Sequence, residues 1–183
     1  FNSHLDNGLL TEECLEAVDE VAASSLTDAK DKLKQQNFVY LPLRNFAPKL
    51  LDLLQVRSVL GVRSIVNTAV KLINPVAART IFLGIFHPPY IQLNMGAAAL
   101  LQQPCLGVIK GGGGEAERNI LKPIKLFQLD KGEEQATSWP AYELESCPQG
   151  IRDYPVTVDY LSDIWHGRVK DEYAVKIILG TTA

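Results

Sequence analysis

Two apolar runs with a helical segment between them constrain the fold of this chain more than any other feature. "ARTIFLGIF", residues 78–86, is almost entirely apolar, which is typical of a strand covered on both faces of a parallel sheet. "HPPYIQLNMGAAALLQQ" follows with a helical pattern, and "PCLGVIK" predicts the next buried strand. Parallel strands joined by a crossover helix form a β-α-β unit. The sequence therefore predicts an α/β fold with a mainly parallel central sheet flanked by helices.

The other segments predict further elements around this unit. One helix, capped by Thr11, is expected within the first twenty-odd residues of the chain. Further helices are expected from about Thr27 to Gln36, from Phe46 with Pro48 in its first turn, around Val156 to Trp165, and from about Asp171 onward. Strands are expected over 37–43 ("NFVYLPL") and 124–129 ("IKLFQL"), with "ATSWPAYEL" as an extended edge piece that contains a proline. Buried helical stripes are predicted at Leu50, Leu53, Leu54 and Leu60, and then at Val62, Ile65, Val66, Ala69 and Ile73.

Length, charge and cysteine usage exclude several classes of protein. At 183 residues, one compact α/β domain over 1–183 is expected, and its net charge of −3 provides no general attraction to nucleic acid or anionic membranes. Three widely separated cysteines favour neither a disulfide framework nor a zinc site, so a cytoplasmic or other reducing compartment is expected, an organelle stroma or matrix included. No apolar run is long enough to span a membrane. The chain starts at Phe1 and ends within an amphipathic pattern, so a domain truncated at both ends is expected.

The stretch "GVIKGGGGEAERNI", residues 107–120, is the first candidate for a functional site. Its four adjacent glycines do not match a dinucleotide fingerprint, and Lys110 precedes them instead of following them as in a P-loop. The loop does begin where a buried strand ends, which is where ligands bind in open α/β sheets. A flexible turn with solvated Glu115 and Glu117 is an equally good interpretation of the composition.

Arg57 is the second candidate, because it lies on the same predicted stripe as Leu50, Leu53 and Leu54. A buried arginine needs an anionic partner, either a structural carboxylate or a bound ligand. The three histidines are far apart in the sequence, and no serine has a G-x-S-x-G setting. A catalytic triad or a histidine metal cluster is therefore not indicated.

"QVRSVLGVRSIVNTAVKLINPVAARTIFLGIFHPPYI", residues 55–91, resembles the central segment of the anthranilate phosphoribosyltransferase family. That segment contains V-R-x-x-L-G-x-R-[ST], then F-N-x-L-G-P-L-x-N-P, a strand and His-Pro. The resemblance implies the α/β catalytic domain of a nucleoside phosphorylase/phosphoribosyltransferase-like protein, with the N-terminal helical domain largely absent. It further implies transfer of phosphoribose from phosphoribosyl pyrophosphate to an aromatic or nitrogenous acceptor, with Mg²⁺. Arg57 matches the arginine that contacts the aromatic carboxylate in that family.

The chain also departs from the family at positions that matter for the reaction. The family loop reads roughly V-H-G-x-x-G-x-D-E, and "IKGGGGEAE" aligns Ala116 with the metal-binding aspartate and Glu117 with the glutamate. Val70 and Lys71 replace a Gly-Pro near the acceptor, which argues against anthranilate as the acceptor. In that family a G-T-G-G-D loop and a Lys-His-Gly-Asn-Arg segment grip the pyrophosphate and the acceptor. Both segments are absent from these residues. Such departures resemble a paralogous branch that keeps the fold without the biosynthetic reaction, some members of which bind nucleic acid.

Two functions are therefore predicted. The first is a phosphoribosyltransferase-like pentosyl transferase whose acceptor is not anthranilate, and the second is a non-catalytic paralogue that binds nucleic acid, a nucleotide or a protein partner. The resemblance assigns no catalytic residue. It implies a substrate-binding set of Arg57, Arg63, Asn67, Lys71, Lys110, Gly111 and Gly114, with Glu117 as a metal ligand and Glu115 as the alternative ligand. Members of the family often dimerise through the helical domain, so a homodimer remains open.

Overall fold

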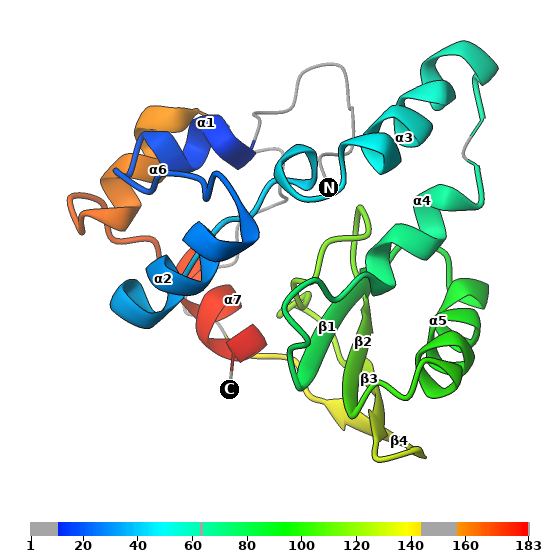
Figure 1. The fold of residues 1–183 in the computed structure, drawn as a ribbon. Helices are drawn as coiled ribbons and strands as arrows, with labels where there is room; N and C mark the ends of the chain where they lie inside the picture. Colours follow the sequence, from blue (N-terminus) through cyan, green and yellow to red (C-terminus); the bar gives the residue numbers. More distant parts are fainter. Residues whose placement is uncertain (1–10, 63, 144–156, 183) are drawn as a thin grey trace. The chain divides into compact units, whose positions relative to one another are not determined.

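The computed structural model describes residues 11–62, 64–143 and 157–182, which form two compact units (Figure 1). The first unit comprises Phe1–Ala77 and Pro155–Val169, and the second comprises Ala78–Tyr154 and Lys170–Ala183. The expectation of a single domain over residues 1–183 stays a prediction. Within the described part of the chain, no helix has the length and apolar character needed to cross a bilayer.

A four-stranded sheet forms the centre of the second unit. Its strands lie in the order β1 (Thr80–Ile85), β2 (Cys105–Lys110), β3 (Ile124–Asp130) and β4 (Glu133–Trp139). β1 and β2 are parallel, and α5 (Pro89–Leu100) connects them and packs against β2 and β3 (Figure 1). The predicted β-α-β unit and the α/β class are confirmed.

The sheet is mixed, whereas the sequence predicted a mainly parallel one. β3 is antiparallel to β2, and β4 is antiparallel to β3. The connection from β2 to β3 contains the glycine loop and no helix, so the chain reverses direction without a crossover. A tight turn at Lys131 (φ 49°) and Gly132 (φ 89°) joins β3 to β4, since two residues with positive φ suit a two-residue hairpin. β4 lies at the edge of the sheet, as predicted, but it begins before the predicted extended piece.

Each face of the sheet has its own set of buried residues, because successive residues of a strand point to opposite sides. Ile109, Ile124 and Leu126 form a buried cluster on one face, and Phe82 and Trp139 pack against it. The opposite face carries alternate buried residues of β1, β2 and β3: Leu83, Leu106, Val108 and Leu129. The buried positions of α5 are Ile91, Asn94, Met95 and Ala98. The unit ends with α7 (Glu172–Thr182), which confirms the last predicted helix.

The first unit is helical in its described part. It contains α1 (Thr11–Glu16), α2 (Leu26–Gln36), the 3-10 turn η1 (Leu43–Asn45), α3 (Pro48–Leu60), α4 (Val66–Ala69), the 3-10 turn η2 (Val70–Leu72) and α6 (Val158–Trp165). α6 packs against α1, and the Ser162 hydroxyl donates to the carbonyl of Ala17 at 3.2 Å. The helices predicted near α2, α3 and α6 are confirmed.

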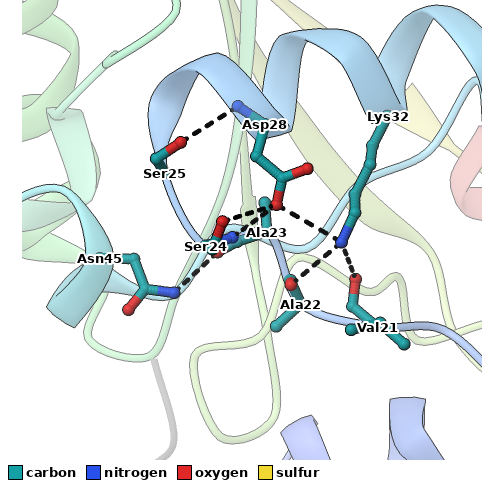
Figure 2. A network of polar contacts seen from close by, with 8 residues as sticks. All are labelled: Val21, Ala22, Ala23, Ser24, Ser25, Asp28, Lys32 and Asn45. Atoms are coloured by element: carbon teal, nitrogen blue, oxygen red, sulfur yellow. Dashed lines mark hydrogen bonds and ion pairs between the residues drawn. The ribbon is translucent and has the colours of Figure 1, made fainter.

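A polar network holds the start of α2 (Figure 2). Ser25 is the N-cap, and its hydroxyl accepts from the amide of Asp28 at 3.1 Å. The Asp28 carboxylate in turn accepts from the amide and the hydroxyl of Ser24, at 2.8 and 3.0 Å. Lys32 reaches back to the carbonyls of Val21 and Ala22 and lies 3.5 Å from the Asp28 carboxylate. These contacts satisfy groups that a helix start would otherwise leave unpaired.

Three predictions for the first unit are wrong. Residues 37–43 form no strand, because the described residues of this unit offer no neighbouring strand to pair with, and the Tyr40 carbonyl instead accepts from the Ala23 amide at 2.8 Å. α1 ends at Glu16, well before the end of the predicted helix. The predicted buried stripes are not buried throughout: Leu53, Leu60, Val62, Ile65 and Ile73 are exposed.

Candidate functional site

The glycine-rich loop lies at the edge of the sheet where β1 and β2 both end. The parallel register pairs Ile85 with Lys110, and the Gly111 amide donates to the Ile85 carbonyl at 3.1 Å. The loop therefore leaves the sheet at the carboxyl ends of the two parallel strands. This position matches the expectation from the sequence, and it is where α/β sheets bind ligands.

Two glycines let the loop fold back tightly onto β1. A Cβ atom at Gly84 would overlap the carbonyl carbon and oxygen of Glu115 and would lie 2.5 Å from the amide nitrogen of Ala116. A Cβ atom at Gly111 would likewise overlap the Glu115 carbonyl oxygen. Gly114 has φ 95°, a conformation that L side chains rarely adopt. The loop is therefore a packed structure and not a free turn.

Glu115 closes the loop with its own side chain. The Gly112 amide donates to Oε1 of Glu115, and the Gly113 amide donates to Oε2 at 2.6 Å. Backbone amides that converge in this way form an anion-binding concavity, and here the chain supplies the anion. In this conformation both oxygens of the Glu115 carboxylate are engaged by the protein backbone.

Glu117 is the second carboxylate of the loop, and its pKa is raised. Loss of hydration around the carboxyl group is the larger cause and the nearby negative charge of Glu115 is the smaller, although the residue as a whole is exposed to solvent. The described residues contain no group of three or more His, Cys, Asp or Glu side chains that could hold a metal ion. With Glu115 committed to backbone amides, the loop does not fit a magnesium site formed by the protein alone. Mg²⁺ thus stays a prediction from the resemblance.

Arg118 follows the two glutamates and is nearly buried, with 6% of its surface exposed. Its guanidinium carbon lies 5.0 Å from the ring centre of Trp139 and 4.8 Å from that of Tyr142. It donates to the carbonyls of Pro140 and of Gly180 in α7, while its Nε has no hydrogen-bond partner in the described structure. Arg118 ties the end of the loop to α7 and to the end of β4.

The sequence analysis did not single out Arg118. The residues that bury it lie far along the chain, so no local pattern marked it.

Lys110 is exposed beside a group of exposed aromatic rings at the end of β1. Its Nζ lies 5.6 Å from the ring centre of Phe86. The Phe86 ring meets His87 edge-on at 4.6 Å between centres, and Tyr90 lies 6.3 Å beyond His87. Phe86 and Tyr90 expose 42% and 43% of their surfaces. This combination of a cation with accessible rings suits stacking on a flat group that carries negative charge.

The remaining predicted residues belong to the first unit. Asn67 is half-buried in α4, where its side-chain oxygen accepts from the amide of Ser64 at 2.9 Å and from its hydroxyl at 3.3 Å. Lys71 is half-buried in η2. Arg57 lies in α3, but its side chain is outside the described structure, as is Arg63 entirely. A single site formed by these four residues and the glycine loop therefore stays a prediction.

Comparison with known proteins gives partial matches. No protein-family model matches the chain. The chain is 37% identical to an uncharacterised protein of Aquifex aeolicus over 81 residues, which are 44% of this chain and 26% of that protein. It is 34% identical to anthranilate phosphoribosyltransferase of Metallosphaera sedula over 86 residues, 47% of this chain and 25% of that enzyme.

A bacterial enzyme with the same name, from Polynucleobacter necessarius, is 30% identical over 95 residues, 52% of this chain and 27% of the enzyme. The chain thus matches about a quarter of the length of these relatives. Over about half of its own length, the chain is a distant relative of the anthranilate phosphoribosyltransferases.

Proposed function

We propose that the whole protein binds phosphoribosyl pyrophosphate and, if it is catalytic, transfers the phosphoribosyl group to a nitrogenous or aromatic acceptor other than anthranilate. The distant relationship to anthranilate phosphoribosyltransferases supports the donor. The observation that carries the proposal is the placement of the loop. It presents backbone amides at the carboxyl ends of two parallel strands, and such amides suit phosphate oxygens.

The chemistry of such a transfer is mainly electrostatic. The bond from the ribose to pyrophosphate breaks, positive charge develops on the sugar, and the acceptor nitrogen then attacks. Lys110 is exposed at the end of β2, and we assign it to the attraction of a phosphate group. We assign Arg57 to the orientation of an acceptor carboxylate, as the resemblance implies. No step of this proposal depends on a metal ion.

The first unit supports an acceptor other than anthranilate. By the resemblance, Val70 occupies a position where the family has glycine, and the residue is 4% exposed. A buried valine fills space that a glycine would leave open to a ligand, so the acceptor pocket should differ in shape. Lys71 adds a positive charge at the next position.

Isothermal titration calorimetry of the whole protein with phosphoribosyl pyrophosphate tests the proposal directly. We expect saturable binding that weakens in Lys110→Ala, while Lys125→Ala, which removes an exposed charge from β3, serves as the matched control. Titrations with and without Mg²⁺ then show whether a metal contributes. Absence of binding under both conditions would refute the proposal.

The second candidate function is that of a non-catalytic paralogue that binds nucleic acid, a nucleotide or a protein partner. The exposed Phe86 and Tyr90 rings beside Lys110 favour it, because bases stack on accessible aromatic side chains. The net charge of −3 argues against strong general affinity for nucleic acid. Fluorescence anisotropy with a single-stranded oligonucleotide should show binding that Phe86→Ala weakens severalfold. Equal binding by Phe86→Ala and the unmodified protein would eliminate this surface as the site.

A further inference from the structure

The amides of Gly112 and Gly113 already hold an anion that belongs to the chain itself. Each amide donates to a different oxygen of the Glu115 carboxylate. Adjacent amides that converge on one carboxylate form a receptor for oxyanions, and such receptors also bind phosphate. The resident carboxylate therefore indicates which ligand chemistry this part of the loop accepts.

The backbone and the side chain of Glu115 are held by separate contacts. The Glu115 carbonyl lies directly against Gly84 and Gly111, which leaves no room for a Cβ at either position. Glu115 is exposed to solvent, and its carboxylate accepts hydrogen bonds from the two loop amides. Rotation of the side chain could therefore free the amides while the backbone stays packed against β1.

We propose that Glu115 is a built-in anionic plug of an oxyanion receptor formed by the Gly112 and Gly113 amides, and that a phosphate group binds there only by displacing the Glu115 carboxylate. The proposal rests on the proposed function for its ligand class, the phosphate groups of a phosphorylated substrate. It gives Glu115 a role opposite to that of a metal ligand, because the carboxylate competes with phosphate instead of recruiting it.

The test compares the unmodified protein with Glu115→Gln. Glutamine has nearly the same size, but it lacks the charge and can accept with only one of its two terminal atoms. The whole protein is titrated with inorganic pyrophosphate in the absence of divalent metal, and the NMR signals of the Gly112 and Gly113 amides are followed. We expect Glu115→Gln to bind pyrophosphate at least about tenfold more tightly, with both amide signals shifting on binding.

Glu117→Gln is the matched control, because it removes the same charge two residues away without touching the amide contacts. If the carboxylates weakened binding only by general repulsion of pyrophosphate, both variants would gain the same affinity, and that result would overturn the proposal. A gain confined to Glu115→Gln supports it.

Hydrogen exchange at the Gly112 and Gly113 amides shows whether the loop rearranges in Glu115→Gln. Pyrophosphate should restore the protection of these amides that the substitution removes, and failure to restore it would overturn the proposal. Binding of phosphoribosyl pyrophosphate that leaves the Gly112 and Gly113 signals unmoved in every variant would preserve the proposed function and overturn the plug alone.

Discussion

Gly84→Ala is the sharpest test of how the glycine loop packs on β1. The added methyl group would overlap the carbonyl of Glu115 and lie 2.5 Å from the amide nitrogen of Ala116. Ordinary contact requires the loop backbone to retreat by more than about 1 Å, and no side-chain rotation can absorb this movement because the neighbour is backbone. Overpacking of this kind costs about 1–3 kcal/mol.

Two further effects modify this cost. Displacing Glu115 weakens its charge-assisted bonds to the loop amides, while alanine lowers the entropy of the unfolded chain by about 0.4–1 kcal/mol. We expect a net loss of roughly 2 kcal/mol, which corresponds to a melting temperature lowered by about 4–8 °C in a protein of this size.

Gly96→Ala is the control for this experiment. Gly96 lies in α5 with no atom within 4 Å of its added Cβ, so alanine should stabilise the protein by about 0.5–1 kcal/mol. Thermal and urea unfolding followed by circular dichroism measures both variants, and hydrogen exchange at Gly112 and Gly113 reports the loop. If Gly84→Ala were as stable as Gly96→Ala and kept its amide protection, the close approach of Glu115 to β1 would be refuted.

Three further substitutions test separate parts of the structure. Arg118→Ala should lower the free energy of unfolding by about 2–4 kcal/mol, because it removes two carbonyl contacts and two ring contacts, and urea unfolding measures this loss. Ser25→Ala removes the N-cap of α2 and should cost about 1 kcal/mol by the same measurement, whereas an unchanged stability would contradict the cap. The raised pKa of Glu117 means that folding favours its protonated form, so stability is lost as the pH rises from the ordinary value of 4.5 through the folded value. Glu117→Gln should therefore be more stable than the unmodified protein at neutral pH. The gain should be no more than about 1 kcal/mol, because Glu117 is exposed and solvent offsets both the loss of hydration and the repulsion by Glu115, and it should vanish below pH 4.5. A difference that persists in acid would show that the carboxyl charge is not its cause.

The sequence predicted best those elements whose cause is local. β1, α5 and β2 follow from an apolar run, a helical pattern and a second apolar run, and all three are present. Residues 37–43 have the composition of a strand, but a strand also needs a hydrogen-bonded neighbour, and composition does not supply one. The predicted stripe of α3 failed for a similar reason: periodicity shows that a face is apolar, while burial depends on what covers that face.

The candidate site also combines features with a local cause and features that depend on tertiary contacts. The position of the glycine loop at the end of β2 could be predicted, because it depends on where one strand ends. The binding of the Glu115 carboxylate by the loop amides could not be predicted, because it depends on the direction of a side chain. The burial of Arg118 could not be predicted either, because it depends on contacts between residues far apart in the sequence. The sequence also pointed to Glu115 as a second choice for a metal, whereas the structure commits its carboxylate to backbone amides.

By itself, the sequence determined the α/β class, the parallel pair with its crossover helix, and the distant relationship to phosphoribosyltransferases, because these depend on short-range periodicity and on the order of motifs. Only the tertiary structure decided that the sheet is mixed, that Gly84 must be a glycine for the loop to approach, and that a buried arginine ties the loop to α7. The physical reason is that helix and strand patterns repeat within a few residues. Close packing and the pairing of buried polar groups, in contrast, involve residues that meet only once the chain has folded.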